Sequence, residues 1–205
     1  MNYIDLHNIE VLGDSKQSSF EDLCLHLFCR DLKVSVIDSY KNQPGIETEP
    51  VTIKNKKIGF QVKYFQGKFD WNQIKHSLLG SENKKTKSKN LDIIFPDNVF
   101  KKYSLNKVYI YSNKEKTLSG RNKTKAEKLI DKVLATYNCQ IVYLCDKALQ
   151  LTLSKPSNKD LAQLYFGISD ELGLIKKTIP TKTLTFLNST ECLNLPLVGK
   201  RSISH

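Results

Sequence analysis

The sequence predicts an α/β fold in which a central mixed β-sheet is flanked by helices. Two alternating segments on either side of the polar residues 54–57 (KNKK) predict an antiparallel hairpin. Further along, residues 108–111 (VYIY) and 140–145 (QIVYLC) predict two strands, joined by an amphipathic helix over 124–137. Strands joined by such a crossover run parallel in one sheet. Antiparallel and parallel pairs together therefore predict a mixed sheet.

Composition predicts a soluble globular chain. With 205 residues, of which 40% are hydrophobic and 26% charged, the chain is long enough to bury a core. It has no apolar run of about 18 residues, and its opening MNYIDLHNIE lacks the basic-then-apolar pattern of a signal peptide. We therefore expect a cytoplasmic protein without a membrane partner. One domain is expected over residues 1–175, followed by an irregular tail or linker over 176–205.

The cysteines are expected to be reduced. The sequence contains five of them: Cys24, Cys29, Cys139, Cys145 and Cys192. Their number is odd, they form no Cys-x-x-Cys pair, and three of them lie in apolar stretches. This pattern predicts core thiols rather than disulfides or a zinc site.

The first predicted helix covers residues 20–31. Apolar side chains recur there at helical spacing and form one buried stripe: Phe20, Leu23, Cys24, Leu27 and Phe28. Glu21 flanks this stripe and has two interpretations. It closes a capping box with Ser18, or it approaches the metal site described below. His26 lies among apolar neighbours and is expected to be a satisfied histidine rather than a ligand.

Residues 44–65 (PGIETEPVTIKNKKIGFQVKYF) place carboxylates on one hairpin strand and a Gln-x-Lys on the other. Residues 33–40 (KVSVIDSY) are expected to form the strand before them. Side chains two apart on a strand share a face, which predicts Glu47 within reach of Lys63. Glu49 shares the face of Glu47 but lies about 7 Å further along, and is expected to be a surface group or a group that supports the metal ligands from behind. The opposite, apolar face is expected to hold Ile46, Phe60, Val62 and Tyr64.

A carboxylate, an amide oxygen and a lysine at a sheet edge suit metal-assisted attack on a phosphodiester. Mg²⁺ binds oxygen ligands and keeps several waters, so one or two carboxylates and a carbonyl are enough. A neighbouring lysine can orient or deprotonate the attacking water, or stabilise the charge that builds on the phosphate. The pattern therefore predicts a Mg²⁺ site, in which Mn²⁺ is able to substitute, at Glu47 and Gln61 with Lys63 beside it.

Gly-Ile-Glu at 45–47, Gln-Val-Lys at 61–63 and the helical Phe20-Glu21 resemble the PD-(D/E)XK nuclease superfamily, in particular its Mrr-like branch of restriction endonucleases. The resemblance covers about residues 18–80, and Glu47 stands where the family usually has Asp. It implies a restriction-endonuclease-like fold and a metal held by Glu47, Gln61 and the Val62 carbonyl. It also implies catalytic roles for Glu21, Glu47, Gln61 and Lys63.

Basic residues are concentrated after this motif. Between residues 84 and 128 there are thirteen Lys or Arg and four acids, an excess of nine within a net charge of +11. Residues 70–79 predict a helix that carries Lys75 and His76, and a last helix is predicted over 157–168. Residues 81–90 (SENKKTKSKN), the basic loop, predict a mobile loop or a helix extension. Lysines expected to contact nucleic-acid phosphates are Lys75, Lys84, Lys85, Lys87 and Lys89; the alternative is an ordinary solvated surface.

The candidate site, together with what the resemblance implies, therefore predicts a Mg²⁺-dependent endonuclease that cleaves double-stranded DNA. Mrr-like modules often belong to prokaryotic anti-phage defence proteins, including antiviral STAND NTPases, so the resemblance implies a fused or associated NTPase or sensor. Two alternatives stay open. The first is RNA cleavage, since phosphate contacts do not distinguish the sugars. The second is a catalytically inactive DNA- or RNA-binding module of the same fold. The sequence leaves open whether the protein forms a homo-oligomer.

Overall fold

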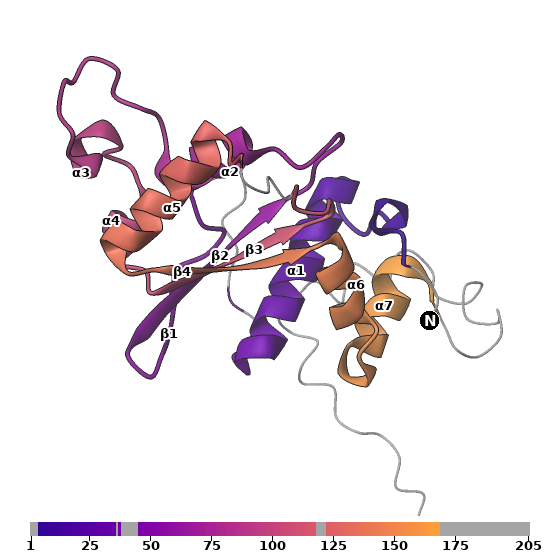
Figure 1. The fold of residues 1–205 in the computed structure, drawn as a ribbon. Coiled ribbons are helices and arrows are strands. Elements are labelled where there is room, and N and C mark those ends of the chain that lie inside the picture. The colour runs from indigo at the N-terminus through magenta and orange to yellow at the C-terminus, as the bar shows by residue number, and fades with distance from the viewer. Residues whose placement is uncertain (1–3, 36, 38–44, 118–121, 169–205) are drawn as a thin grey trace, which may run out of the picture. The chain divides into compact units, whose positions relative to one another are not determined.

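A computed structural model describes residues 4–35, 37, 45–117 and 122–168 of the chain. The described residues between 4 and 166 form one compact unit. At its centre lies a four-stranded sheet, made of β1 (Val51–Ile53), β2 (Lys56–Lys63), β3 (Lys107–Ser112) and β4 (Gln140–Cys145) in that order. β1 is antiparallel to β2, whereas β2, β3 and β4 are parallel. The predicted mixed α/β sheet is confirmed (Figure 1).

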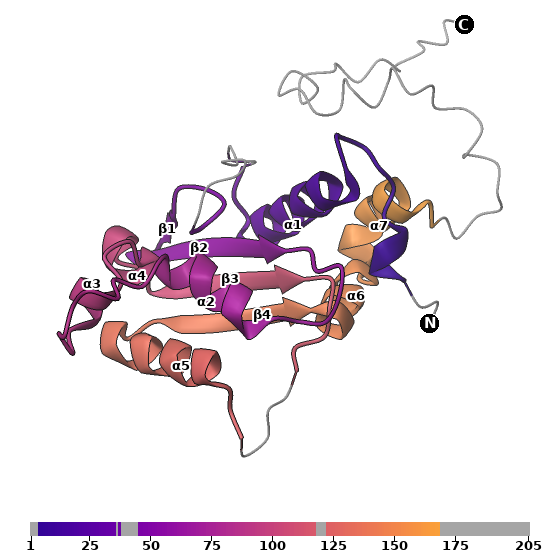
Figure 2. The same ribbon diagram turned by 90° about the horizontal axis from the view of Figure 1, so that it is seen from above.

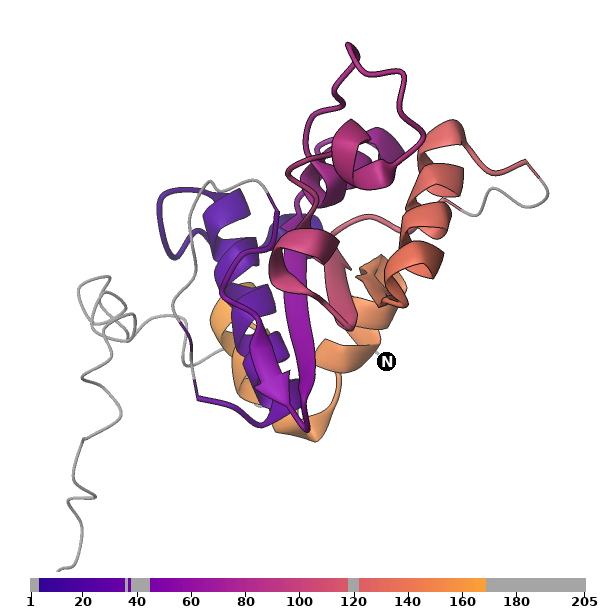
Figure 3. The same ribbon diagram turned by 90° about the vertical axis from the view of Figure 1, so that its left-hand side faces the viewer.

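Helices cover both faces of the sheet, as Figures 1 and 3 show. One face carries α2 (Trp71–Leu79), α4 (Val99–Tyr103) and α5 (Lys125–Tyr137), with the short α3 (Leu91–Ile94) beside them. The other face carries α1 (Lys16–Leu32) and α7 (Lys159–Phe166). α6 (Asp146–Leu153) follows β4 directly, and two short 3₁₀ helices are η1 (Leu6–Asn8) and η2 (Pro156–Asn158). None of the helices in the described part of the chain is long and apolar enough to cross a membrane.

The core has an apolar layer on each side of the sheet. On the α1 face, Phe28 stacks on Phe60 with ring centroids 4.5 Å apart, and Tyr111 meets Phe60 edge-on at 6.1 Å. The layer on the opposite face includes Ile46, Ile74, Leu78, Val108, Ile110 and Ile130. Ile46 was expected on the face of Phe60, and that prediction is wrong. Ile46 precedes β1, so the two-residue periodicity of a strand does not apply to it.

α1 begins at Lys16 rather than at Phe20. Ser15 is its N-cap, and the Ser15 hydroxyl accepts a hydrogen bond from the Ser18 N–H at 3.1 Å. Ser18 therefore lies inside the first turn, and the interpretation in which Ser18 and Glu21 form a capping box is wrong. Glu21 instead accepts a hydrogen bond from the Gln17 side chain, one turn earlier, at 3.0 Å. A capping role no longer competes for this carboxylate.

The C-terminal end of α1 prevents the predicted strand from starting at Lys33. Lys33 adopts the left-handed conformation, with φ 55° and ψ 42°, and its N–H returns to the carbonyls of Arg30 and Cys29. This turn redirects the chain, so residues 33–35 and 37 have no strand structure. The rest of the predicted strand, at 36 and 38–40, lies outside the described residues.

The hairpin between β1 and β2 is tighter than predicted. Lys54 and Asn55 alone form its turn, with φ of 48° and 62°. Two consecutive residues with positive φ are characteristic of a type I′ turn, whose twist matches antiparallel strands. Lys56 and Lys57 belong to β2, where they pair with Ile53 and Thr52. The antiparallel hairpin itself is confirmed.

Several other predicted elements are confirmed. α2 follows its N-cap Asp70, and α5 follows Thr124, whose hydroxyl accepts from the Glu127 N–H at 3.1 Å. β4 has its predicted bounds, whereas α7 is shorter than residues 157–168 because η2 precedes it. The cysteines in the described part of the chain are buried free thiols: Cys24, Cys29, Cys139 and Cys145. Cys192, the predicted tail and the boundary after residue 175 lie outside that part.

Candidate active site at the edge of strand β2

Glu47 lies in the irregular segment before β1 and docks on the edge of β2. Its N–H donates to the Phe60 carbonyl at 2.9 Å, and its carboxylate oxygen Oε1 accepts from the Val62 N–H at 3.2 Å. β1 pairs only with residues 56–58 of β2. Glu47 therefore satisfies the backbone groups of β2 that β1 does not reach. The expectation that Glu47 lies on a strand is wrong, since β1 begins at Val51.

Gln61 is buried next to Glu47, with only 2% of its surface exposed. Its amide nitrogen Nε2 donates to Glu47 Oε1 at 2.9 Å. Its amide oxygen Oε1 is buried and receives no hydrogen bond from the described residues. A buried acceptor without a partner costs about 1–3 kcal/mol. Gln61 therefore supplies an oxygen that a cation or a cation-bound water would satisfy.

The oxygen atoms around Glu47 fit a Mg²⁺ ion. Neighbouring ligands of Mg²⁺ lie about 2.9 Å apart, because metal–oxygen bonds are about 2.0–2.1 Å long. The Gln61 atom that lies 2.9 Å from the Glu47 carboxylate is the amide nitrogen Nε2, so ligation by Gln61 requires its amide to turn over and bring the oxygen to that position. The Val62 carbonyl faces the same edge as the Val62 N–H, because both groups of one strand residue point toward the same neighbour. Among the described residues, no three Asp, Glu, His or Cys side chains gather as a metal site. A metal at Glu47 would therefore keep several water ligands.

Burial raises the pKa of Glu47 from 4.5 to about 7. Loss of hydration is the largest cause, and the charge of Glu21 adds to it. The Val62 N–H, the Lys63 ammonium and the Gln61 amide stabilise the ionised form and oppose the rise. Carboxyl groups that titrate near neutral pH are concentrated at functional sites. The Glu47 carboxyl group is therefore half-protonated near pH 7 and is able to exchange its proton for a cation.

Lys63 and Glu21 lie near Glu47 from opposite sides of the sheet. Both are half-buried, and both act electrostatically on the Glu47 carboxyl group. Lys63 is the last residue of β2, opposite Ser112 of β3, whereas Glu21 lies on α1. In the described part of the chain Lys63 forms no ion pair, so its ammonium is available for a substrate. Because Glu47 lies at the edge of the sheet, groups from both faces approach it.

Glu49 lies apart from this group of residues. It is exposed, as expected for a surface residue, and its charge acts on Lys102 of α4. The expectation that it shares a strand face with Glu47 is wrong, because residues 45–50 form no strand. One carboxylate of this segment, that of Glu47, therefore belongs to the candidate site.

The basic loop forms no helix, and its four lysines are exposed. Side chains of Asn83, Thr86, Ser88 and Asn90 each accept a hydrogen bond from the backbone N–H two residues ahead. The loop therefore consists of consecutive side-chain-stabilised turns. Figures 1 and 2 show it between α2 and α3, toward the end of the sheet opposite to the one where β2 and β3 end. Lys75 is half-buried on α2.

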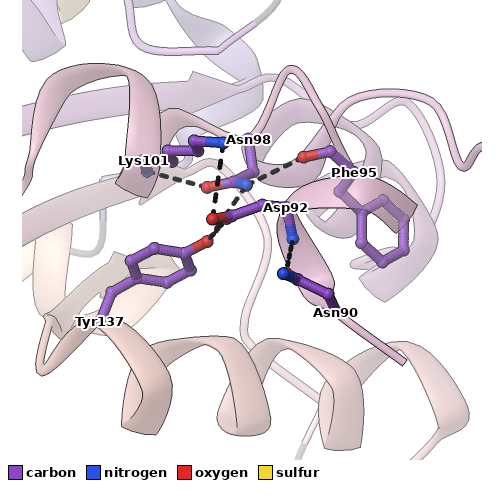
Figure 4. A network of polar contacts seen from close by, with 6 residues as sticks. All are labelled: Asn90, Asp92, Phe95, Asn98, Lys101 and Tyr137. Atoms are coloured by element: carbon purple, nitrogen blue, oxygen red, sulfur yellow. Dashed lines mark hydrogen bonds and ion pairs between the residues drawn. The ribbon is translucent and has the colours of Figure 1, made fainter. Parts of the chain in front are cut away.

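A polar network holds the end of the basic loop against α4 and α5 (Figure 4). Tyr137 of α5 donates to the carboxylate of Asp92, and Lys101 pairs with the same carboxylate at 3.5 Å. Asn98 donates to the Phe95 carbonyl at 2.9 Å and caps α4 through the Lys101 N–H at 2.8 Å. The Tyr137 hydroxyl is the main cause of a lowered pKa at Asp92. This network fixes α3, which begins directly after the loop.

Asn113 has a positioning role that no sequence pattern indicated. Its Oδ1 accepts from the Phe65 N–H at 2.7 Å, and its Nδ2 donates to the Phe65 carbonyl at 3.0 Å. Only 2% of Asn113 is exposed. The Asn113 side chain thus makes two hydrogen bonds to the Phe65 backbone, as one more paired residue of β3 would. Asn113 therefore fixes the chain two residues beyond Lys63, whereas an Asn after a strand ordinarily indicates a turn.

His26 takes no part in the candidate site. Its Nδ1 lies 3.2 Å from the hydroxyl of Tyr165 on α7, and their rings meet edge-on at 6.1 Å. Burial lowers the pKa of His26. The expectation that this histidine is satisfied within the fold is confirmed.

No protein-family model matches the chain, and no curated protein matches it. The functional interpretation therefore depends on the residues and the geometry described above. The central part of that geometry is the meeting of Glu47 with Gln61 at the edge of β2.

Proposed function

We propose that this chain is a Mg²⁺-dependent endonuclease that hydrolyses phosphodiester bonds of double-stranded DNA. The observation that carries the proposal is the 2.9 Å approach of Gln61 to Glu47, in a buried site with an unsatisfied amide oxygen. Lys63 and Glu21 lie within electrostatic range of the same carboxyl group. The resemblance to Mrr-like nucleases supports DNA as the substrate and prokaryotic anti-phage defence as the setting.

Each residue has a defined part in this proposal. Glu47, Gln61 and the Val62 carbonyl hold the cation, and Glu21 assists through a water molecule. Mg²⁺, when bound, supplies positive charge to the phosphate and lowers the pKa of a coordinated water. The Lys63 ammonium orients the attacking water or donates to a phosphate oxygen where charge accumulates. Asn113 keeps Lys63 in place by fixing Phe65.

The basic loop would contact the duplex away from the cleaved bond. β2 has eight residues and spans about 26 Å at about 3.3 Å per residue. A duplex rises about 3.4 Å per base pair. If it lay along β2, the phosphates next to the two ends of the strand would be about seven base pairs apart. Exposed lysines of the loop would then neutralise backbone charge, and their effect would be on affinity rather than on the chemical step.

The proposal is tested by incubating supercoiled plasmid with the protein and Mg²⁺, with EDTA as the control. Nicked and linear products are expected with Mg²⁺ or Mn²⁺ and none with EDTA. Glu47→Gln should abolish cleavage, whereas Glu49→Gln, which also removes one negative charge, should leave it unchanged. Absence of cleavage with either metal, or full activity of Glu47→Gln, would refute the proposal. Duplex RNA in the same assay decides between the two nucleic acids.

One observation favours a second candidate, a catalytically inactive module that binds DNA or RNA. Glu47 Oε1 already accepts hydrogen bonds from the Val62 N–H and the Gln61 amide, so the carboxylate also serves to complete the edge of β2. On this interpretation the chain binds nucleic acid through its basic surface and cleaves none. Binding without cleavage in the plasmid assay, equal in wild type and Lys63→Ala, identifies this candidate.

A further inference from the structure

Basic groups from the N-terminal segment and from the residues after β3 come together beyond the C-terminal ends of β2 and β3. Lys114 Nζ, just after β3, contacts the ring nitrogen Nε2 of His7 in η1. Lys16 Nζ, in the first turn of α1, donates to the His7 carbonyl at 2.7 Å. His7 and Lys114 are half-buried, whereas Lys16 is exposed. His7 is therefore contacted by two ammonium groups, by that of Lys114 at its ring and by that of Lys16 at its backbone carbonyl.

One carboxylate, that of Asp5, lies beside this cluster and offsets part of its positive charge. Neither lysine forms an ion pair with a carboxylate of the described residues. The Asp5 carboxylate is engaged in capping η1, where it accepts from the His7 N–H at 3.0 Å and from the Asn8 side chain at 3.3 Å. An ammonium only donates, so His7 Nε2 must accept and its ring proton lies on Nδ1. A half-buried ammonium that contacts an imidazole ring instead of a carboxylate would gain a charge-assisted hydrogen bond from a bound anion.

The cluster adjoins the candidate active site through Tyr64. The His7 ring meets the Tyr64 ring edge-on with centroids 6.0 Å apart, and the Phe20 ring lies 5.4 Å from the same ring. Tyr64 follows Lys63 in the chain, and Phe20 precedes Glu21. One DNA strand carries a phosphate every ~3.4 Å along the helix axis, so a strand bound at Lys63 brings further phosphates toward His7.

We propose that His7, Lys16 and Lys114 form a phosphate-binding subsite, which takes a phosphate group next to the bond on which Lys63 acts. The placement next to that bond rests on the proposed nuclease function, whereas binding of a phosphate oxyanion does not. The bound oxyanion accepts from both ammonium groups.

The test measures phosphate binding without metal and without cleavage. Inorganic phosphate is titrated into the full chain while the ring signals of His7 are followed by NMR. Saturable binding is expected in wild type, and Lys114→Met should weaken it roughly tenfold or more because a charge-assisted hydrogen bond is lost. Lys132→Met, which removes the same charge from an exposed position on α5, should change it less than about twofold. Asp5→Asn keeps an oxygen for the η1 cap and removes a negative charge, so binding should tighten about two- to threefold.

Two further ligands identify the source of the phosphate group. Binding of a thymidine dinucleotide that is lost in its methylphosphonate analogue assigns the subsite to the backbone diester. Binding of inorganic phosphate alone assigns it to a terminal phosphate. Equal affinities in wild type and Lys114→Met, or equal losses in Lys114→Met and Lys132→Met, overturn the subsite. A chain that binds phosphate at His7 but cuts no DNA refutes the nuclease and leaves the subsite standing.

Discussion

Replacing Glu47 with Gln removes a titrating group and keeps an oxygen acceptor for the Val62 N–H. In the folded chain burial raises the pKa of Glu47 to about 7, from an ordinary value of 4.5. Between these two pH values the folded state holds a proton that the unfolded state has released. The stability linked to this proton is therefore fully present below about pH 4.5 and is lost as the pH rises through about 7. Gln at this position has no such dependence.

The size of the effect follows from the two pKa values. The rise in the pKa of Glu47 from 4.5 to about 7 corresponds to a change in stability of at most about 3.4 kcal/mol, at about 1.36 kcal/mol for each pKa unit. The side chain of Glu47 is half-buried and keeps some contact with water, which reduces the expected effect to about 2–3 kcal/mol. The Glu47→Gln chain should therefore gain about this much stability relative to wild type between pH 4.5 and pH 8.

Urea unfolding at a series of pH values in EDTA measures this difference directly. Titrating groups that do not interact with residue 47 contribute equally to wild type and variant, so they cancel when the two free energies of unfolding are subtracted. Glu49→Gln is the matched control, because Glu49 is exposed, and its curve should run parallel to wild type. Parallel curves for Glu47→Gln as well, within about 0.5 kcal/mol, would show that Glu47 is not held in a desolvated position.

Three further predictions concern the metal, Lys63 and the basic loop. Mg²⁺ affinity, measured by calorimetry, should be weak and should rise with pH up to about 7 and level off above it, because the ion displaces the Glu47 proton; an affinity independent of pH would exclude Glu47 as a ligand. Asn113→Ala should slow single-turnover cleavage roughly tenfold with DNA affinity unchanged, since a displaced Lys63 affects the chemical step alone; an unchanged rate in a folded variant would remove Asn113 from the mechanism. Reversing the charge of the four basic-loop lysines should weaken DNA binding at every sequence and flatten its salt dependence by up to about 0.9 per lost contact, whereas identical slopes would mean that the loop never meets phosphate.

The architecture of the sheet follows from local sequence patterns. The alternation on either side of residues 54–57 predicted the antiparallel pair of β1 and β2. The strand, helix and strand over 108–145 predicted the parallel pair of β3 and β4. These patterns succeed because one periodicity continues over enough residues to define a buried face. The shorter α3, α4 and α6 escaped prediction, since four to eight residues give little periodic signal. Their positions depend on tertiary contacts such as the bond from Tyr137 to Asp92.

The sequence identified the members of the candidate site but not how they are held. Glu47 was predicted from a strand periodicity that does not exist at its position, and it reaches β2 through its own hydrogen bonds instead. For Glu21 the sequence also allowed a capping box with Ser18. The N-cap of α1 is Ser15, three residues before Ser18. Asn113 lies 48 residues from Phe65, and no local pattern reports a contact across that separation. The contact between Asn113 and Phe65 forms only because β2 and β3 lie side by side in the folded sheet.

Single-turnover cleavage of a DNA duplex by Lys63→Ala tests the central claim most directly. Lys63 lies at the end of β2 and forms no ion pair among the described residues, so its removal should leave folding and DNA affinity intact. The rate with Mg²⁺ should fall about 100-fold or more, as expected when a group that stabilises transition-state charge is lost. Lys68→Ala, an exposed lysine five positions later, should cut at the wild-type rate. Cleavage by Lys63→Ala within about threefold of wild type would contradict the proposed active site.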